Sequence, residues 1–308
     1  MIGEFEIINK IRKDFPKIGD DCAEIITPKP GKKLITSTDA FVEGTHFKRQ
    51  YFTGYDIGYK SFTASISDIA ACGGIPKYGL IALGMPNGDT TFVNSLYAGI
   101  KAVSKKYKVE IIGGDTVLSP FVFVSITIIG ETEKFITRKG AKVGDIICVT
   151  GTVGSASAGL TALEKGIKSK CTKNQLNPEA CVKEGLLLVP YASSMIDISD
   201  GLISDLTHIL EESKVSAKIY PDKIPIDKEV FKVAKMVGCK AEYFALNGGE
   251  DYELLFTLPA RLLKKAKDKI KFTEIGEIIL LNKKPQVIDE KGNIILAKGF
   301  DHFKKGKK

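Results

Sequence analysis

Apolar positions in the first 135 residues switch repeatedly between a spacing of two and a spacing of three to four, which predicts alternating strands and helices. Strands are predicted at 33–38, 78–83, 109–112 and 121–129. Helices are predicted at the amino terminus, from the N-cap candidate Asp56 to Gly73-Gly74, and around 92–103. The opening helix rests on four apolar residues at helical spacing, namely Phe5, Ile8, Ile11 and Phe15.

The second half alternates in the same way after a glycine- and lysine-containing loop near residue 140. Helices are predicted at 178–189, directly after Gly201, and at 230–237, and strands at 146–150, 252–257, 271–279 and 286–295. The chain is therefore predicted to be an α/β protein with two domains, 1–137 and 138–308. Ligand sites of α/β sheets commonly lie just beyond strand ends.

Composition adds limits to this picture. The chain has 308 residues, a hydrophobic content of 44% and a charged content of 27%, which is typical of a soluble two-domain protein. No apolar run approaches the roughly 20 residues of a membrane span, and the acidic start does not resemble a signal peptide, so a cytoplasmic location is expected. The six cysteines form no C-x-x-C pair and predict no zinc or disulfide framework.

The net charge of +8 leaves a nucleic-acid partner open as an alternative. However, the lysines are not interleaved with aromatic residues, and a lysine-rich solvated surface is the simpler interpretation. A positive surface would also attract anionic nucleotides.

Six aspartates stand near turns or element ends, most beside glycine, serine or threonine: Asp21, Asp39, Asp68, Asp115, Asp197 and Asp200. Hard oxygen ligands on such segments suit Mg²⁺, which bridges carboxylates to substrate phosphates. If the fold gathers even four of these carboxylates, only divalent cations could offset their repulsion. The pattern therefore indicates phosphoryl transfer.

Two of the motifs also have plain structural interpretations. In G-G-D-T (113–116) the glycines could admit a phosphate beside Asp115, or the motif could be an ordinary strand-to-loop turn. In D-I-S-D-G-L (197–202) the two aspartates could share a cation on one helical turn, or Asp200 could cap the helix. No Walker P-loop and no protein-kinase signature is present.

Single residues elsewhere leave similar alternatives. Asp68 lies within a predicted helix on one face with Lys60 and Ala64, which is either a ligand-bearing face or an exposed polar face. His46 and the glycine-displayed Glu250 could serve a site or be structural. His208 and His302 are expected at the surface.

Taken in order, the motifs resemble those of the thiamine-monophosphate kinase family, within the aminoimidazole ribonucleotide synthetase-like superfamily. The resemblance covers nearly the whole chain and rests on G-D-D, S-T-D-x-x-V-E-G-x-H-F, S-D-I-A-A-C-G, G-G-D-T, I-D-I-S-D-G-L and G-G-E-D-Y-E-L. It implies Mg²⁺-assisted transfer of the ATP γ-phosphoryl group to thiamine monophosphate, with several Mg²⁺ ions and no phosphoenzyme. The implied fold has an amino-terminal sheet that forms a dimeric barrel in a homodimer and a carboxyl-terminal α/β domain that closes the cleft.

The resemblance also implies roles for individual residues. The catalytic acids would be Asp39, Asp68 and Asp115, and the metal ligands Asp21, Ser37, Thr38, Asp39, Asp68, Asp115, Asp197 and Asp200. ATP would contact Gly114, Asp115, Arg138 and Ser199, and thiamine monophosphate would contact His46, Glu250 and Phe300.

The chain departs from the family in having no tryptophan near its carboxyl end, so Phe300 is the nearest aromatic candidate to stack on the thiamine ring. An aminoimidazole ribonucleotide synthetase-like ligase is the closest enzymatic alternative. The segment S-T-D-x-x-V-E-G-x-H-F favours the kinase.

Overall fold

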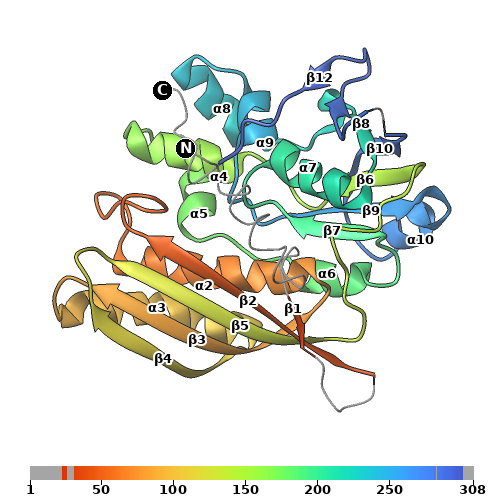
Figure 1. Cartoon of the computed structure of the whole chain (residues 1–308). Coiled ribbons are helices and arrows are strands. Elements are labelled where there is room, and N and C mark those ends of the chain that lie inside the picture. Colours follow the sequence, from red (N-terminus) through yellow and green to blue (C-terminus); the bar gives the residue numbers. More distant parts are fainter. Residues whose placement is uncertain (1–22, 26–30, 282, 301–308) are drawn as a thin grey trace.

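Two α/β domains lie against each other in the computed structural model, which describes residues 23–25, 31–281 and 283–300 (Figure 1). The first domain carries a five-stranded sheet in the order β1-β2-β5-β3-β4. Its strands are β1 (Ala23–Ile25), β2 (Lys33–Val42), β3 (Ile75–Met85), β4 (Glu110–Leu118) and β5 (Phe123–Thr132). The pair β3 and β4 is parallel and the other neighbours are antiparallel.

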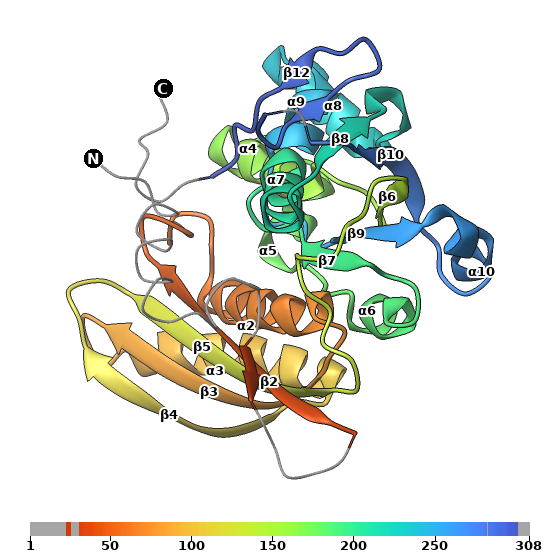
Figure 2. The same cartoon turned by 45° about the vertical axis from the view of Figure 1, so that its right-hand side comes forward.

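Helices α2 (Gly54–Ala71) and α3 (Thr90–Tyr107) cover one face of this sheet and leave the other face open (Figure 2). Strand β5 alternates buried and half-buried residues, as expected when only one face is covered. The covered face supplies core residues such as Ile35, Ile81 and Ile126. Within the described chain this sheet is open and forms no closed barrel.

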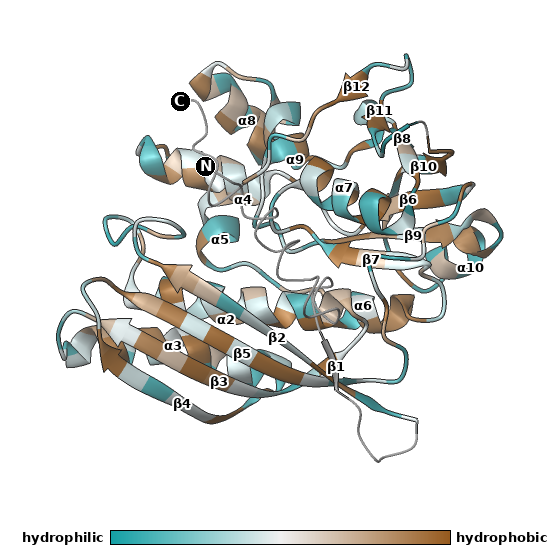
Figure 3. Ribbon diagram, in the orientation of Figure 1, coloured by the Kyte–Doolittle hydropathy of each residue, from teal (hydrophilic) through white to brown (hydrophobic). Residues whose placement is uncertain are grey.

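The second domain carries a seven-stranded sheet in the order β12-β11-β8-β10-β6-β9-β7. Its strands are β6 (Asp145–Val149), β7 (Ser194–Asp197), β8 (Ser216–Ile219), β9 (Leu254–Pro259), β10 (Thr273–Ile279), β11 (Val287–Ile288) and β12 (Ile294–Ile295). Its helices are α4 (Ser155–Glu164), α5 (Cys171–Leu176), α6 (Val182–Leu188), α7 (Leu202–Ser213), α8 (Lys228–Val237), α9 (Ala241–Asn247) and α10 (Leu263–Lys267). Hydrophobic segments mark the strands of both sheets (Figure 3).

Helix α2 lies at the interface between the domains, since it packs on its own sheet and also contacts α5, α6 and β7 of the second domain. Gly185 of α6 permits this docking, because a Cβ there would lie 2.3 Å from the carbonyl oxygen of Ala70. The side chain of Asn177 donates to Asp56 across the same interface, and the amide of Ala180 donates to the Tyr107 hydroxyl.

Most predicted elements are confirmed, and the differences have local causes. Thr53, not Asp56, is the N-cap of α2: the two residues form a capping box in which Asp56 occupies the third helical position. The predicted helix at 178–189 is confirmed only as α6 (Val182–Leu188), because the segment before it is held by contacts to α2 and α3. Helix α5 (Cys171–Leu176) was not predicted and ends at Asn177, before a proline. Strands β7 and β8 and helix α9 are short and were not predicted.

Two predicted strands continue past the glycines or acids expected to end them. Strand β2 runs through Asp39 to Val42, and β4 runs through Gly113, Gly114 and Asp115 to Leu118. Backbone pairing of β2 with β5 and of β4 with β3 keeps these residues extended, despite the low strand propensity of glycine and aspartate. The opening helix and His302 lie outside the described residues. None of the helices at 31–281 and 283–300 has the length and apolar character needed to cross a bilayer.

Candidate active site

Acidic residues from both domains converge on Tyr252. This tyrosine belongs to the second domain but packs into the hydrophobic core of the first, with 4% of its surface exposed. Burial raises the pKa of its phenol well above the usual value, and the nearby carboxylates of Glu250, Asp39, Asp197 and Asp68 raise it further. Four predicted site acids therefore lie close enough to one buried side chain to influence its ionisation.

The first domain contributes its acids from β2 and α2. Ser37 and Asp39 lie on the face of β2 that meets α2, and the Ser37 hydroxyl donates to the carboxylate of Asp68. Thr38 points to the opposite, open face of the sheet, where its hydroxyl lies 2.9 Å from that of Thr127. Asp68 is half-buried on the same helical face as Lys60 and Ala64, so the interpretation as an exposed polar face is wrong.

The second domain contributes its acids from the loop between β7 and α7. Asp197 is the last residue of β7 and both of its carboxylate oxygens are buried, whereas Asp200 lies in the loop. The two residues are thus not on one helical turn, and Gly201, not Asp200, is the N-cap of α7. Helix α7 begins only after Gly201, whose φ of 125° turns the chain between strand and helix, so both aspartates precede the helix.

Asp205, which was not predicted, holds this loop. Its Oδ2 accepts the backbone N–H groups of Ser199, Asp200 and Gly201 at 3.1, 3.1 and 3.0 Å. Burial raises the pKa of Asp205 well above its usual value, and the carboxylates of Asp200 and Asp197 add to the shift. The loop therefore brings the carboxylates of Asp197, Asp200 and Asp205 close to one another.

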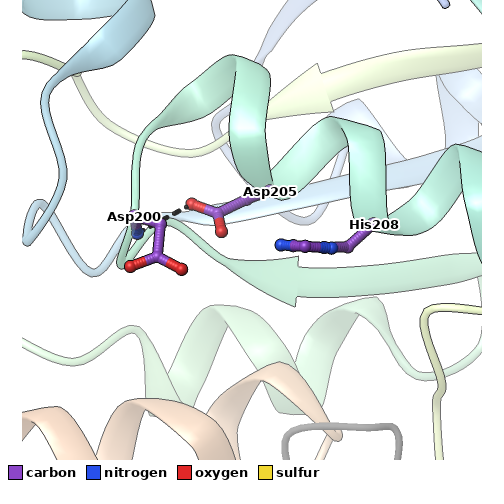
Figure 4. A group of neighbouring side chains, drawn as sticks. All are labelled: Asp200, Asp205 and His208. Carbon is purple, nitrogen blue, oxygen red and sulfur yellow. Dashed lines mark hydrogen bonds between the residues drawn. The ribbon is translucent and has the colours of Figure 1, made fainter. Parts of the chain in front are cut away.

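His208 extends this group, because one potential ligand atom each from Asp200, Asp205 and His208 lies within 4.8 Å of the others (Figure 4). The expected surface position of His208 is wrong: its side chain is 15% exposed. Burial lowers its pKa to about 4, and the positive charge of Arg138 contributes. Arg138, a predicted ATP ligand, also acts on Asp205 and so lies close to the loop that carries Ser199.

Two predicted substrate residues meet from opposite ends of the chain. The rings of His46 and Phe300 are 6.5 Å apart between centroids, and His46 is 5.2 Å from the ring of Phe41. The Nδ1 atom of His46 accepts the amide N–H of Val42 at 2.9 Å, which fixes the orientation of the ring. The amide of Phe300 donates to the carbonyl of Asp200 at 3.3 Å, so this aromatic ring, 49% exposed, borders the acidic loop.

Glu250 stands on a tightly packed loop. Glu250 and Tyr252 adopt left-handed backbone conformations with φ of 67° and 53°, which non-glycine residues seldom do. Gly249 allows the loop to touch the acidic loop, since a Cβ there would lie 2.1 Å from the carbonyl oxygen of Ser199. Glu250 is held by two residues that were not predicted: its Oε1 lies 2.6 Å from Lys60 Nζ, and its Oε2 accepts from Gln175 at 2.8 Å.

Two predicted site residues are not brought to this cluster. Gly114 and Asp115 lie on the edge strand β4, three strands away from Asp39 on β2, and both are exposed. The Oδ1 atom of Asp115 accepts the neighbouring amide N–H of Thr116 at 2.8 Å. Asp21 lies outside the described residues.

The donor set suits a hard divalent cation. Carboxylate and hydroxyl oxygens predominate; burial raises the pKa of Asp205, the carboxylates of Asp200 and Asp197 raise it further, and a bound cation would favour the ionised form of this acid. The cluster lies between two domains, where a substrate can contact both. Such an arrangement can bind phosphates through metal ions and align two anionic substrates.

Family models for the two halves of AIR synthase related proteins match the chain, the N-terminal domain at residues 19–132 and the C-terminal domain at 142–281. The chain is 35% identical to the thiamine-monophosphate kinase of Aquifex aeolicus over 98% of both chains. It is 39% identical to that of Buchnera aphidicola subsp. Schizaphis graminum over 97% of this chain and 98% of the other.

Solved structures agree with these similarities. The structure of AaThiL complexed with AMPPCP and TMP superposes with a TM-score of 0.89 at 34% identity, covering 98% of this chain and 97% of that one. The thiamine monophosphate kinase from Aquifex aeolicus gives a TM-score of 0.84 at 31% identity, covering 94% and 97%.

Proposed function

Because the chain belongs to the thiamine-monophosphate kinases among the AIR synthase related proteins, we propose that it transfers the γ-phosphoryl group of ATP to thiamine monophosphate. The product is thiamine diphosphate. The observation that carries the proposal is the gathering of Asp39, Asp68 and Asp197 around Tyr252 at the contact between the two domains. An ATP analogue and TMP are bound together in the related structure of AaThiL.

The acids serve to recruit cations. Bound Mg²⁺ would neutralise the phosphates of both substrates, which is the main obstacle to bringing two polyanions together. We propose that several Mg²⁺ ions are held by Asp21, Ser37, Thr38, Asp39, Asp68, Asp115, Asp197 and Asp200. Thr38 would act through its main chain in its own subunit, because its side chain lies on the far face of the sheet.

Positioning then supplies much of the rate. The phosphate of thiamine monophosphate is already ionised, so the reaction needs no strong general base and no phosphoenzyme. His46, Glu250 and Phe300 line the side of the cluster at which the thiamine moiety would bind. Arg138 and Ser199 lie beside Asp205 and would contact ATP.

The position of Gly114 and Asp115 favours a homodimer. Asp39 pairs across β5 and β3 with Gly114, which puts three strand spacings, about 14 Å, between them. Asp115, the next residue, points to the open face. It is too far away to share a cation with Asp39 of the same subunit.

A second copy of the sheet would resolve this separation. Among the described residues, β1 covers the outer edge of β2 only at 34–36, and the outer edge of β4 is unpaired. Exposed apolar side chains such as Tyr78, Ile112 and Leu118 stand on β3 and β4. Closure of two such sheets into a dimeric barrel would cover these edges and bring Asp115 of the partner subunit toward Asp39.

The direct test of the reaction is incubation with ATP, Mg²⁺ and thiamine monophosphate, followed by chromatography for thiamine diphosphate. No product, together with turnover of formylglycinamidine ribonucleotide, would replace the proposal with a ligase. Salt-dependent nucleic-acid binding without any nucleotide turnover would favour the non-enzymatic alternative.

Co-expression of Asp39→Asn and Asp115→Asn subunits tests the dimer. If Asp115 acts across the interface, mixed dimers carry one intact site, and about a quarter of wild-type activity should return from two inactive variants. No recovery in verified mixed dimers, or a monomer in sedimentation, would contradict the dimeric site.

The proposed reaction draws on cytoplasmic ATP, and we assign the protein to that compartment. We retain 137/138 as the proposed boundary between the ATP- and Mg²⁺-binding dimerisation domain and the domain that closes the cleft.

A further inference from the structure

A fully buried lysine stands beneath the substrate side of the site. Lys60 lies on α2 with 1% of its surface exposed, and its ammonium group is 2.6 Å from Oε1 of Glu250 in the other domain. It also lies 5.4 Å from the centroid of the Phe52 ring. Lysine is almost never buried to this extent unless it is paired, so the pair with Glu250 demands an explanation.

The other oxygen of the same carboxylate is also held. Gln175 of α5, itself 1% exposed, donates to Oε2 of Glu250 at 2.8 Å. One buried ion pair and one hydrogen bond, from two different segments, thus hold the two oxygens of one carboxylate. Glu250 remains 26% exposed, so it is the member of the group that faces solvent and ligand.

The helix that carries Lys60 also carries Asp68, two turns further along the same face. Any movement of this helix would therefore shift Lys60 and Asp68, a proposed metal ligand, together. On the other side of the loop, Asp251 accepts the N–H groups of Gly154 and Ala156 at 2.6 and 2.9 Å, which secures the backbone but not the Glu250 side chain. The orientation of that side chain depends on Lys60 and Gln175.

We propose that Lys60 and Gln175 are positioning residues, which hold the Glu250 carboxylate toward thiamine monophosphate and tie it across the domain interface to the helix of Asp68. The inference rests on the proposed function and deepens it. Lys60 compensates its buried charge through Glu250, while Glu250 keeps lone pairs for donors on the substrate.

Steady-state kinetics of the full-length enzyme test the inference. Lys60→Met keeps the length and apolar stem of the side chain and removes the charge. We expect the KM for thiamine monophosphate to rise about ten- to a hundredfold, the scale of losing one charged contact that orients the carboxylate. The KM for ATP should stay within about twofold. Gln175→Leu should give a smaller rise with the same selectivity.

Lys106→Met is the matched control. Lys106 also pairs with a glutamate of the other domain, at 2.8 Å from Glu179, but both side chains are exposed. Neither KM should change by more than about twofold, because exposed pairs contribute little.

Thermal unfolding separates positioning from simple stabilisation. Glu250→Gln leaves the Lys60 charge buried without its acid and should lower the midpoint more than Lys60→Met does, because Glu250 can be hydrated. The double variant should recover the midpoint of Lys60→Met but keep the raised KM.

An unchanged KM for thiamine monophosphate in both Lys60→Met and Gln175→Leu would overturn the inference while leaving the proposed function intact. Equal rises in the KM of both substrates would do so as well. A wild-type enzyme that makes no thiamine diphosphate would overturn the proposed function and this inference with it.

Discussion

Replacement of Asp205 by alanine should disorganise the acidic loop without touching any substrate-facing side chain. The change removes the acceptor of three backbone N–H groups, those of Ser199, Asp200 and Gly201, all bound within 3.1 Å. Asp205 is 1% exposed, so its removal also leaves a small cavity behind the loop. The loop carries one predicted ATP ligand and one predicted metal ligand.

The size of the expected loss of stability depends on which of the three amides water can reach after the substitution. A buried N–H group without an acceptor costs about 1–3 kcal/mol. Gly201 is buried, whereas Ser199 and Asp200 are half-buried and can bind water. Burial desolvates the Asp205 carboxylate, as its raised pKa indicates, so removing this group recovers part of the lost stability. We expect Asp205→Ala to lower the free energy of unfolding by about 2–3 kcal/mol.

Activity should fall further than stability. Displacement of catalytic groups by about 1 Å costs about a hundredfold in rate, so kcat/KM should fall at least that much. Asp205→Asn keeps one acceptor oxygen and should lose about 1 kcal/mol with an intermediate kcat/KM.

Urea unfolding followed by circular dichroism gives the stability, and chromatography of thiamine diphosphate gives the rate. Asp268→Ala, an exposed acid of the same domain, is the control and should match the wild type. An Asp205→Ala variant within about 0.5 kcal/mol of the wild type and with kcat/KM within threefold would refute the role assigned to this carboxylate.

Three further predictions concern the interface, pH and metals. Gly185→Ala should push α6 away from Ala70 and lower both the melting temperature and kcat. Gly88→Ala is the control and should be neutral, because a Cβ there would meet nothing within 4 Å. Equal melting temperatures of the two variants would contradict the role of Gly185 at the interface. Burial raises the pKa of Asp251 from 3.8 to about 7, so between these pH values the folded state retains a proton that the unfolded state loses. The free energy of unfolding should therefore fall as the pH rises from about 4 to 7, by at most about 1.4 kcal/mol per pH unit. Urea titrations at pH 5 and 7.5 should show this slope in the wild type and lose it in Asp251→Asn; an identical slope in both would refute the assignment. Chelation of divalent cations should abolish turnover, and Asp68→Asn should reduce it by orders of magnitude at saturating Mg²⁺ with an unchanged circular dichroism spectrum; near-wild-type rates would refute the metal role.

Sequence periodicity was sufficient for the elements with strong local signals. Helices α2 and α3 and strand β5 follow directly from apolar spacing. Strand β4 shows the limit, because Gly113 and Gly114 disfavour a strand locally while pairing with β3 keeps the chain extended.

Asp39, Asp68, Asp197 and Asp200 could be chosen as candidate site acids from the sequence, because each stands in a recognisable motif. Their partners could not be chosen in this way. Asp205 looks like an ordinary helical acid, and its importance comes from three amides turned toward it by Gly201. Lys60 looks like a surface lysine, and only the docking of the second domain buries it against Glu250. Both depend on contacts between segments distant in sequence or turned by an unusual backbone angle.

The segment from Glu250 to Glu253 belongs to two environments in alternation. Glu250 and Tyr252 face the site, whereas Asp251 binds the start of α4 and Glu253 accepts from Thr150 and Cys181 inside the second domain. A mutational scan should therefore find every position sensitive, but for reasons that alternate residue by residue. Substitutions at Glu250 and Tyr252 should lower kcat/KM more than they lower the melting point, whereas those at Asp251 and Glu253 should mainly reduce the yield of folded protein. Average tolerance over the segment would hide this division of labour.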